Sequence, residues 1–234
     1  MINSNRFPLI SCLCVTHNKP NMLKRVIRCF ENQSYTNKQL IIVYEESDQL
    51  TCEFIMRYNF GLETKIIKVT SNPKLTLGEL RNMSVFEAEG EYVCQWDDDD
   101  WFDPDRLSEQ MKYLQQQGKL ACILSRWIVF NIFTKKAYLS NKRLWEGSVL
   151  CKRDVMLQIP YPSLSKGEDS DVINWLYVHD ELSVIDDQPH LYIYIYNGNN
   201  TWEFDHFKQI FDFSQELPTS FSKEVVQIIT DSNN

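Results

Sequence analysis

The sequence lacks an excess of positive charge and a long hydrophobic run. Its 24 Lys and Arg are outnumbered by 32 Asp and Glu, for a net charge of −8. No basic surface is therefore expected for nucleic acid or an anionic membrane. No run approaches the roughly 18 apolar residues of a membrane span, and the N-terminus has no basic segment followed by an apolar one. We expect a cytoplasmic protein with no nucleic-acid partner and no membrane span.

The sequence also lacks paired cysteines. It contains seven cysteines and no Cys-x-x-Cys. Such free cysteines in apolar runs behave as small hydrophobic residues, and their presence indicates a reducing compartment. The cysteines in strand-like runs are Cys12, Cys14, Cys94, Cys122 and Cys151.

The N-terminal part alternates strands and helices. Apolar runs at 9–16, 40–44 and 65–69 predict buried strands, and helices are predicted at 20–30 and 50–58. A β-α-β-α-β order is typical of a parallel sheet with helices on both faces. The 234 residues are enough for one large domain with its own core.

Beyond this point the alternation continues for two more helices and then becomes irregular. The tail beyond 213 has weak signals. The further predicted elements are a helix at 77–87, a strand at 92–94, a helix at 104–117, a hairpin over 121–139, a strand at 147–150, a helix at 168–178 and a strand at 191–196.

Four consecutive carboxylates, residues 97–100, follow the strand at 92–94. Trp96 and Trp101 bracket them, and flanking aromatics favour a packed wall over a solvated acidic loop. Four adjacent carboxylates repel one another, so a folded chain tolerates them only with a partner. The position outside the carboxyl end of a strand is where α/β sheets bind ligands.

The spacing of the run suits a metal. Along an extended backbone, Asp97 and Asp99 point one way, while Asp98 and Asp100 point the other. Two carboxylates side by side suit a hard divalent cation, Mg²⁺ or Mn²⁺, that also holds phosphate oxygens. We therefore predict a metal site here.

Several short motifs, in order over about 9–202, resemble the inverting family 2 glycosyltransferases of GT-A fold. Glu45 and Glu46 stand where that family usually has Asp. The motifs are Val15-Thr16-His17-Asn18-Lys19-Pro20, Ile41 to Glu46, Gly78-x-x-Arg81-Asn82, Glu89-Gly90-Glu91-Tyr92, Asp97-x-Asp99-Asp100 with Pro104 downstream, and Glu168-Asp169.

The resemblance implies an α/β architecture of GT-A type. Its mostly parallel central sheet, flanked by helices, would form a Rossmann-like nucleotide half, beside a smaller mixed sheet on the acceptor side. We expect a single domain over 1–234. Its parts would be a nucleotide-sugar-binding half at about 7–104, an acceptor-side half at 105–213 and a C-terminal tail at 214–234.

The resemblance also implies an activity and a cofactor. The expected reaction moves a sugar from a nucleoside-diphosphate sugar, first of all a UDP-sugar, to a hydroxyl of a saccharide, lipid-linked or protein glycan acceptor. Mn²⁺ or Mg²⁺ would act as Lewis acid and template. Assembly of cell-surface polysaccharide, lipopolysaccharide or glycoprotein is the expected setting.

Residue roles follow from the same resemblance. Asp99 would be the closer metal contact, Asp97 would contact metal and ribose, and Arg81 would reach a phosphate oxygen. A surface salt bridge is the alternative for Arg81. The remaining residues of the nucleotide-sugar site would be Thr16, Asn18, Glu45, Glu46 and Asp98.

Inverting transfer needs a base for the acceptor hydroxyl. Asp169 is assigned this role, with Glu168 bracing it or contacting the acceptor. Both residues also fit as first-turn acids favoured by a helix dipole, as does Asp171. Asp100 is expected to orient the acceptor or to brace its loop, and Trp145 to stack on a sugar or to fill core.

A late family motif often has His before Gly, and here that position is Asn197. Because an amide is a poor Mn²⁺ ligand, His206 is a candidate metal ligand in its place, as is His190. A structural role is the alternative for either histidine.

Two other functions stay open. A sugar nucleotidyltransferase would share the fold class, but it would need a Gly-rich phosphate loop near the first strand, and 15–24 contains no Gly. A carbohydrate- or Ca²⁺-binding module would leave the Asp run structural; Arg81, Asp99 and Asp169 together disfavour it. The transferred sugar, the acceptor and the oligomeric state do not follow from the sequence.

Overall fold

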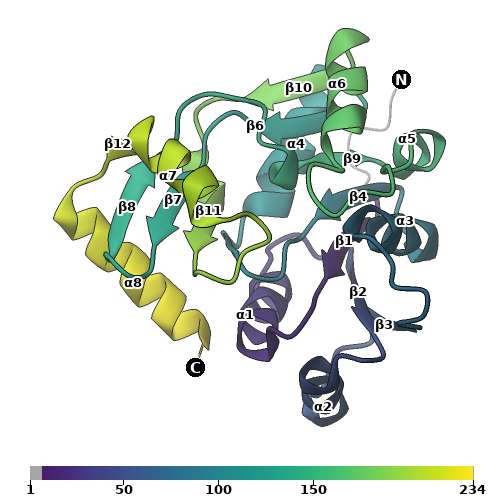
Figure 1. Ribbon diagram of the computed structural model, residues 1–234. Coiled ribbons are helices and arrows are strands. Elements are labelled where there is room, and N and C mark those ends of the chain that lie inside the picture. Colours follow the sequence, from purple (N-terminus) through teal and green to yellow (C-terminus); the bar gives the residue numbers. More distant parts are fainter. Residues whose placement is uncertain (1–6, 234) are drawn as a thin grey trace.

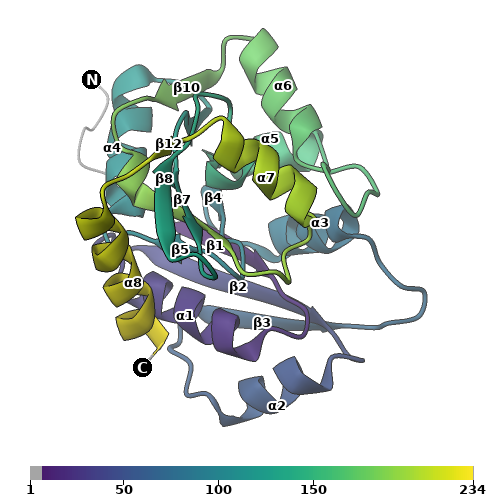
Figure 2. The same cartoon turned by 60° about the vertical axis from the view of Figure 1, so that its left-hand side comes forward.

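The computed structural model describes residues 7–233, which form two β-sheets with helices around them (Figures 1 and 2). Residues 1–6 and 234, which the predicted domain includes, lie outside the described residues. The strands of the large sheet are β1 (Ile10–Val15), β2 (Lys38–Glu45), β3 (Thr64–Val69), β4 (Tyr92–Gln95), β6 (Ala121–Leu124), β9 (Leu150–Lys152) and β10 (Leu182–Ile185). Those of the small sheet are β5 (Trp101–Phe102), β7 (Ile128–Asn131), β8 (Lys136–Leu139), β11 (Tyr192–Tyr196) and β12 (Gln215–Glu216).

The helices follow the strands along the chain. None of those within residues 7–233 is both long enough and apolar enough to cross a membrane. They are α1 (Pro20–Glu31), α2 (Gln49–Arg57), α3 (Leu77–Glu87), α4 (Arg106–Gln117), α5 (Arg153–Gln158), α6 (Ser170–Val178), α7 (Phe204–Asp212) and α8 (Thr219–Asn233), with short 3₁₀ turns η1 (Glu146–Ser148) and η2 (Pro189–Leu191).

The large sheet is mostly parallel, as predicted. Its order is β10-β6-β9-β4-β1-β2-β3. Strands β1 to β4 pair in parallel, and β6 pairs in parallel with β10. Only β9 runs against its neighbours β4 and β6. The carboxyl ends of β1 and β4 therefore meet at one edge of the sheet.

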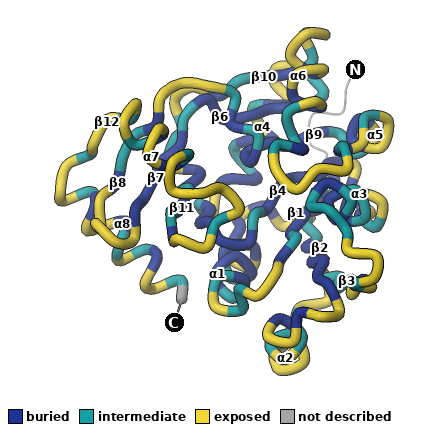
Figure 3. The backbone as a smooth tube through the Cα atoms, in the orientation of Figure 1, coloured by how far each residue is buried: buried dark blue, intermediate teal, exposed yellow. Residues whose placement is uncertain are grey.

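Both faces of this sheet are buried, which explains its near-continuous apolar strands. Along β1, Cys12 and Cys14 join the core on one face, with residues of α1 and α4. Leu13 joins the core on the other face, with residues of α3, α5 and α6. Figure 3 shows these central strands as the most deeply buried part of the chain.

The small sheet is mixed, in the order β12-β8-β7-β11-β5. Strand β11 pairs in parallel with β7 and antiparallel with β5. Because β4 belongs to the large sheet and β5 to the small one, the segment 96–100 between them crosses from one sheet to the other. The acidic run therefore lies at the junction of the two halves.

A buried guanidinium packs under this junction. Arg106, at the start of α4, is fully buried and lies 5.1 Å, 4.6 Å and 4.9 Å from the rings of Trp96, Phe102 and Tyr192. Its Nη2 donates to the carbonyl of Gln95, 3.0 Å away. The aromatic faces and the carbonyl take the place of a carboxylate partner. The complete burial of Trp96 agrees with the predicted packed wall.

The irregular half differs from its predicted elements in two places. The predicted hairpin over 121–139 does not begin at 121, because its first part, 121–130, is divided between the sheets: β6 ends at Leu124 in the large sheet, and β7 begins at Ile128 in the small one. The hairpin itself is β7 with β8. The strand predicted at 147–150 begins only at Leu150, because η1 occupies the residues before it.

Helix boundaries also shift. The helix predicted at 104 begins at Arg106, because the Asp103 carboxylate accepts a hydrogen bond from the backbone N–H of Asp105 and forms a turn first. The tail beyond 213, with weak sequence signals, contains β12 and α8. Helix α8 packs against α1 and β8 (Figures 1 and 2).

Gly78, the first residue of the Gly-x-x-Arg-Asn motif, lies where α3 meets the segment 162–164. Its N–H donates to the carbonyl of Leu164, 2.9 Å away, and a Cβ at this position would lie 1.9 Å from the carbonyl oxygen of Pro162. Only glycine fits this approach without a backbone shift.

We expect Gly78→Ala to lower the free energy of unfolding by about 1–3 kcal/mol or more, because overpacking against backbone is not relieved by rotamer changes. For a chain of this size the melting temperature should fall by roughly 2–4 °C per kcal/mol. Thermal unfolding measures it. Gly61→Ala is the control, because a Cβ there meets only the side chain of exposed Glu63. Equal stability of the two variants would contradict the close approach.

Candidate functional site

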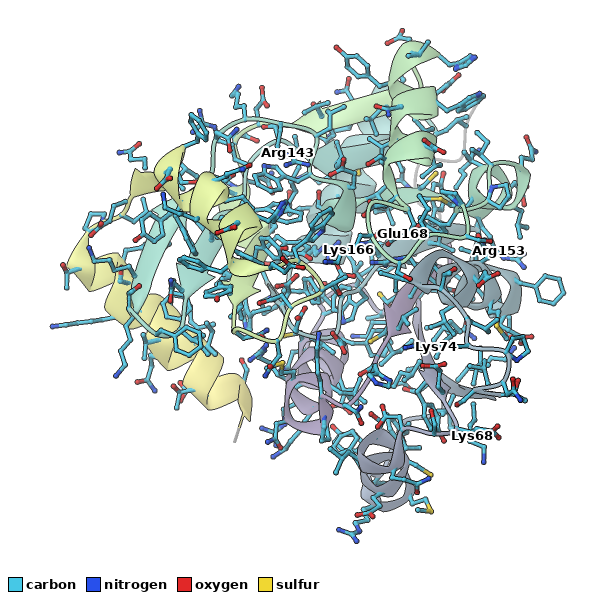
Figure 4. The ribbon with its side chains drawn as sticks, viewed as in Figure 1. Lys68, Lys74, Arg143, Arg153, Lys166 and Glu168 are labelled. Atoms are coloured by element: carbon cyan, nitrogen blue, oxygen red, sulfur yellow. The ribbon has the colours of Figure 1, made fainter. Side chains whose placement is uncertain are left out.

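A cavity opens where the carboxyl ends of β1 and β4 face the small sheet and the loop before α6. Acidic, basic and aromatic side chains line it. In Figure 4, Lys166 and Glu168 lie near the centre of the molecule on that loop, with Arg143 above them. The lining residues include Lys19, Arg81, Asp97, Asp98, Asp99, Asp100, Trp127, Trp145, Lys166, Glu168, Asp169, Tyr194, Asn200, Trp202 and His206.

The acidic run does not alternate as predicted. Strand β4 ends at Gln95, so the carboxylates lie on a turn and not on extended backbone. Asp98 and Asp99 share the Lys19 ammonium, at 3.2 Å and 2.9 Å. Asp97 and Asp100 share the Tyr192 hydroxyl instead. The strict alternation predicted for the four side chains is therefore wrong, but Asp97 and Asp99 still line the same cavity.

The backbone of the run is held from α1. The buried guanidinium of Arg25 donates to the carbonyl oxygens of Asp99 and Asp100. Burial raises the pKa of Asp98 to about 6; neighbouring Asp99 adds to this rise, while Lys19 opposes it. The run is thus crowded enough to shift the titration of its own members.

Asp100 braces the junction. It is fully buried; its Oδ2 accepts from the Tyr192 hydroxyl at 2.6 Å and its Oδ1 from the backbone N–H of Ile195 at 2.9 Å. Burial and the nearby Asp99 and Asp97 carboxylates raise its pKa well above the usual range. With both oxygens engaged, Asp100 has the geometry of the bracing role and not that of the acceptor contact.

Arg81 joins three parts of the chain. Its Nη2 lies 3.0 Å from Asp97 and its Nε 2.7 Å from Glu168. Burial acts to lower the pKa of this guanidinium, but Asp97 and Glu168 outweigh it and raise the pKa. Arg81 from α3 therefore ties the acidic run to the loop before α6, and it is not a surface helix residue.

Asp169 lies beside this pair and lines the cavity. Helix α6 begins one residue later, and the Asp169 side chain makes no capping hydrogen bond to it. Burial raises the pKa of Asp169 to about 7; Arg81 opposes the rise and Glu168 adds to it. A carboxyl group that titrates near neutrality in a cavity is suited to proton transfer.

Asp99 also accepts from two amides of the loop after β11. The Nδ2 atoms of Asn197 and Asn200 lie 3.2 Å and 3.1 Å from its Oδ2. Each amide oxygen is used elsewhere: that of Asn197 accepts from the N–H of Asn199, and that of Asn200 from the N–H of Asn197. Asn197, at the position of the family histidine, therefore acts as a donor to Asp99.

The first-strand motif lies beside the cavity and not in its wall, except for Val15 and Lys19. Thr16 is buried, and its N–H continues the pairing of β1 by donating to Val43. Asn18 has a positive φ of 55°, and its N–H donates to the Asp48 carboxylate at 2.7 Å. Asn18 and Lys19 line a shallower neighbouring hollow.

Glu45 and Glu46 also lie outside the main cavity. Glu45 is buried and its carboxylate lies 3.7 Å from the Nδ1 of His17. Glu46 accepts from the N–H of Ser71, in the loop after β3. Both stand at the carboxyl end of β2, where they can reach only a ligand that extends out of the cavity.

Some of the aromatic rings at the cavity stack on one another. Trp145, buried, lies 4.7 Å from the ring of Trp127, which stacks on Tyr192 at 4.1 Å and an interplanar angle of 3°. His206 lines the cavity and stacks on Trp202 at 4.6 Å. His190 is exposed and does not line the cavity.

Within residues 7–233, no group of three or more His, Cys, Asp or Glu side chains is arranged as a metal centre. His206 therefore does not join Asp97 and Asp99 in a common cluster. The donors that the cavity offers are carboxylate oxygens, which fit Mg²⁺ or Mn²⁺. Lys19 and Arg81 balance those charges in this structure.

Several residues in or beside the cavity wall were not predicted from the sequence. Lys19 belongs to the first-strand motif, but no role was predicted for it, although it is the cation nearest the end of the first strand. Tyr192 and Tyr194 share one face of β11 by strand alternation, which was the available signal. Trp127 carried no signal, because it lies in the turn that leaves the large sheet.

Comparison of sequences finds similar curated proteins. An uncharacterized glycosyltransferase of Methanocaldococcus jannaschii is 30% identical over 131 residues, which is 56% of this chain and 45% of that protein. The hyaluronan synthase of Pasteurella multocida is 28% identical over 119 residues, 51% of this chain and 12% of that protein. The chain thus matches less than half the length of these relatives.

Comparison of structures finds the same fold. The complex of S. aureus TarS 1-349 with UDP-GlcNAc has a TM-score of 0.66 and 16% identity, over 82% of this chain and 60% of that one. The mannosyltransferase PcManGT from Pyrobaculum calidifontis, in complex with GDP-Man and Mn²⁺, has a TM-score of 0.64 and 14% identity, over 82% of this chain and 57% of that one. These likenesses confirm the predicted GT-A architecture.

The family model described as "Glycosyl transferase family 2" matches residues 11–166. This segment is more than half of the chain and contains the acidic run, Arg81 and the first strand. The chain belongs to glycosyl transferase family 2.

Proposed function

We propose that this chain is an inverting glycosyltransferase that moves a sugar from a nucleoside-diphosphate sugar, first of all a UDP-sugar, to a hydroxyl of a glycan or lipid-linked acceptor. One observation carries the proposal. Arg81 bridges Asp97 and Glu168, and Asp169 lines the same cavity beside them. Groups suited to hold a diphosphate and to accept a proton thus face one space.

The donor would lie along the acidic run. A divalent ion, Mn²⁺ or Mg²⁺, on Asp99 and Asp97 would supply Lewis-acid stabilisation of the diphosphate leaving group. Arg81 is placed to neutralise a phosphate oxygen, because its buried guanidinium already faces the carboxylate of Asp97. Glu45 and Glu46, at the end of β2, would meet the base or ribose outside the cavity.

Asp169 would act as the base. It takes the proton of the acceptor hydroxyl as that oxygen forms a bond to the anomeric carbon, while the bond from that carbon to the phosphate oxygen breaks. The nucleoside diphosphate leaves with the electron pair, and attack from the opposite face inverts the configuration. The Arg81–Glu168 pair, at 2.7 Å, would hold the loop of Asp169 in place.

The ligands of similar proteins indicate which donors to test first. Two of the similar solved structures are complexes, one with UDP-GlcNAc and the other with GDP-Man and Mn²⁺. Curated relatives include hyaluronan and chondroitin synthases. These names support a saccharide acceptor. Trp127 and Trp145 are both buried and stack on each other, which favours the core-filling alternative for Trp145.

Binding of nucleotides tests the donor site directly. With Mn²⁺ present, we expect one nucleoside diphosphate among UDP, GDP and dTDP to raise the melting temperature by about 5 °C at 100 times its Kd, as mass action predicts. Asp99→Ala should abolish the shift, because it removes the central carboxylate of the run. Differential scanning fluorimetry measures both.

Asp105→Ala is the matched control, because this acid is exposed and outside the cavity. It should keep the full shift. If no nucleotide stabilises the wild type with any divalent ion, the transferase proposal fails, and a Ca²⁺-binding module becomes the better reading.

The pH dependence tests the base. Because the pKa of Asp169 is raised to about 7, the fraction ionised increases tenfold per pH unit below that value. We expect kcat/KM to rise with the same slope up to about pH 7 and then to level. Asp169→Asn should lower kcat by about 10²- to 10⁴-fold, while Asp171→Asn, an exposed acid on the first turn of α6, should retain activity. A pH profile without this rise would contradict the assignment.

Asp169→Asn, which should lower activity, should raise the stability of the fold. The Asp169 carboxyl has a raised pKa in the folded protein, so it keeps its proton between about pH 4 and pH 7 while the unfolded chain ionises. Stability is therefore lost as the pH rises through this window, and the loss is complete above about pH 7. Asp169→Asn should therefore raise the melting temperature at pH 8 and leave it nearly unchanged near pH 4. A melting temperature that falls at pH 8 would indicate a structural role.

A further inference from the structure

Lys19 occupies the centre of the acidic run. Its ammonium lies 2.9 Å from Asp99 and 3.2 Å from Asp98, and its side chain is only 17% exposed. Both carboxylates are themselves buried, with residue exposures of 7% and 6%. Two buried carboxylates next to each other need a cation, and in this structure the cation is part of the chain.

The other partners of these carboxylates carry no charge that could replace it. Asn197 and Asn200 donate neutral amide hydrogens to Asp99. Arg25 is near, but it donates to backbone carbonyls and not to the carboxylates. Within residues 7–233, the ion pairs of Asp98 and Asp99 are therefore those with Lys19.

The backbone of Lys19 is fixed, while its side chain is flexible, with four carbons between the backbone and the ammonium. Its carbonyl accepts from the N–H groups of Met22 and Leu23 at the start of α1, and the preceding Asn18 is held by Asp48. Lys19 also lines the neighbouring hollow outside the cavity. A lysine so placed can turn its ammonium to a new anion without any backbone change.

We infer that Lys19 is an internal cation that occupies Asp98 and Asp99 in the free protein and transfers to the diphosphate when the donor binds. The inference rests on the proposed function. A divalent ion that reaches Asp99 meets the Lys19 ammonium, and the two positive charges repel each other at this distance. The diphosphate removes this conflict, because it offers Lys19 a second anionic partner.

The consequence is coupled binding. The free protein binds Mn²⁺ weakly, and a nucleoside diphosphate tightens Mn²⁺ binding by giving Lys19 another position. By linkage, Mn²⁺ tightens nucleotide binding by the same factor. Without the Lys19 charge, Mn²⁺ binds Asp99 directly, and the nucleotide adds less to its affinity.

Titration calorimetry of Mn²⁺ into the nucleotide-free protein tests this directly. We expect Lys19→Met to bind Mn²⁺ at least tenfold more tightly than wild type, and Lys19→Arg, which keeps the charge, to stay weak. Lys166→Met is the matched control. Lys166 lines the same cavity but pairs with Glu203, so its loss should change Mn²⁺ affinity less than twofold.

A second titration measures the coupling. With saturating UDP, wild type should gain at least tenfold in Mn²⁺ affinity, and Lys19→Met should gain less than threefold. If Lys19→Met is too unstable for calorimetry, the rise of its melting temperature with Mn²⁺ gives the same answer: a larger rise than in wild type supports the inference, and an equal or smaller rise overturns it.

The two proposals fail in different ways. Equal Mn²⁺ affinity of wild type and Lys19→Met, with normal metal-dependent UDP or GDP binding, overturns the role of Lys19 and leaves the transferase proposal intact. Absence of nucleotide binding in every variant overturns the transferase proposal and with it the transfer of Lys19 to a diphosphate.

Discussion

Repulsion among four neighbouring carboxylates is the constraint on which the rest of the structure depends. The run lies on the crossing between two sheets, where little water can screen it, and its members are compensated from three different elements. Lys19 comes from the start of α1, Arg81 from α3, and Tyr192 from β11. The compensation of charge therefore also holds the two halves of the chain together.

The junction is rigid because polar and aromatic packing support each other there. Asp100 binds the hydroxyl of Tyr192 and the backbone of β11, and the ring of Tyr192 lies between Trp127 and the guanidinium of Arg106. A buried charge without a carboxylate partner would be costly. Here the positive charge of Arg106 is stabilised by the faces of three aromatic rings and by a carbonyl oxygen.

A second link connects the junction to the loop before α6. Arg81 contacts Asp97 on one side and Glu168 on the other, and Gly78 allows the same helix to approach the segment 162–164. One turn of α3 thus sets both the distance of Arg81 from the acidic run and the position of Asp169. The motif Gly-x-x-Arg-Asn reads as one packing unit, because Asn82 completes it with hydrogen bonds to the backbone of Tyr161.

The sequence by itself determined the parallel β-α-β half, the location of the acidic run at a strand end, and the family, because apolar periodicity and local motifs are properties of neighbouring residues. Only the tertiary structure decided how the carboxylates pair, since β4 ends at Gln95 and the run turns toward partners as far as 101 positions away in the chain. The same holds for the division of 121–131 between two sheets and for the stack of Trp127 on Tyr192. Local sequence is compatible with several conformations in these segments, and long-range contacts stabilise one of them. Lys19, for example, contacts Asp98 and Asp99 only when α1 is packed against the junction.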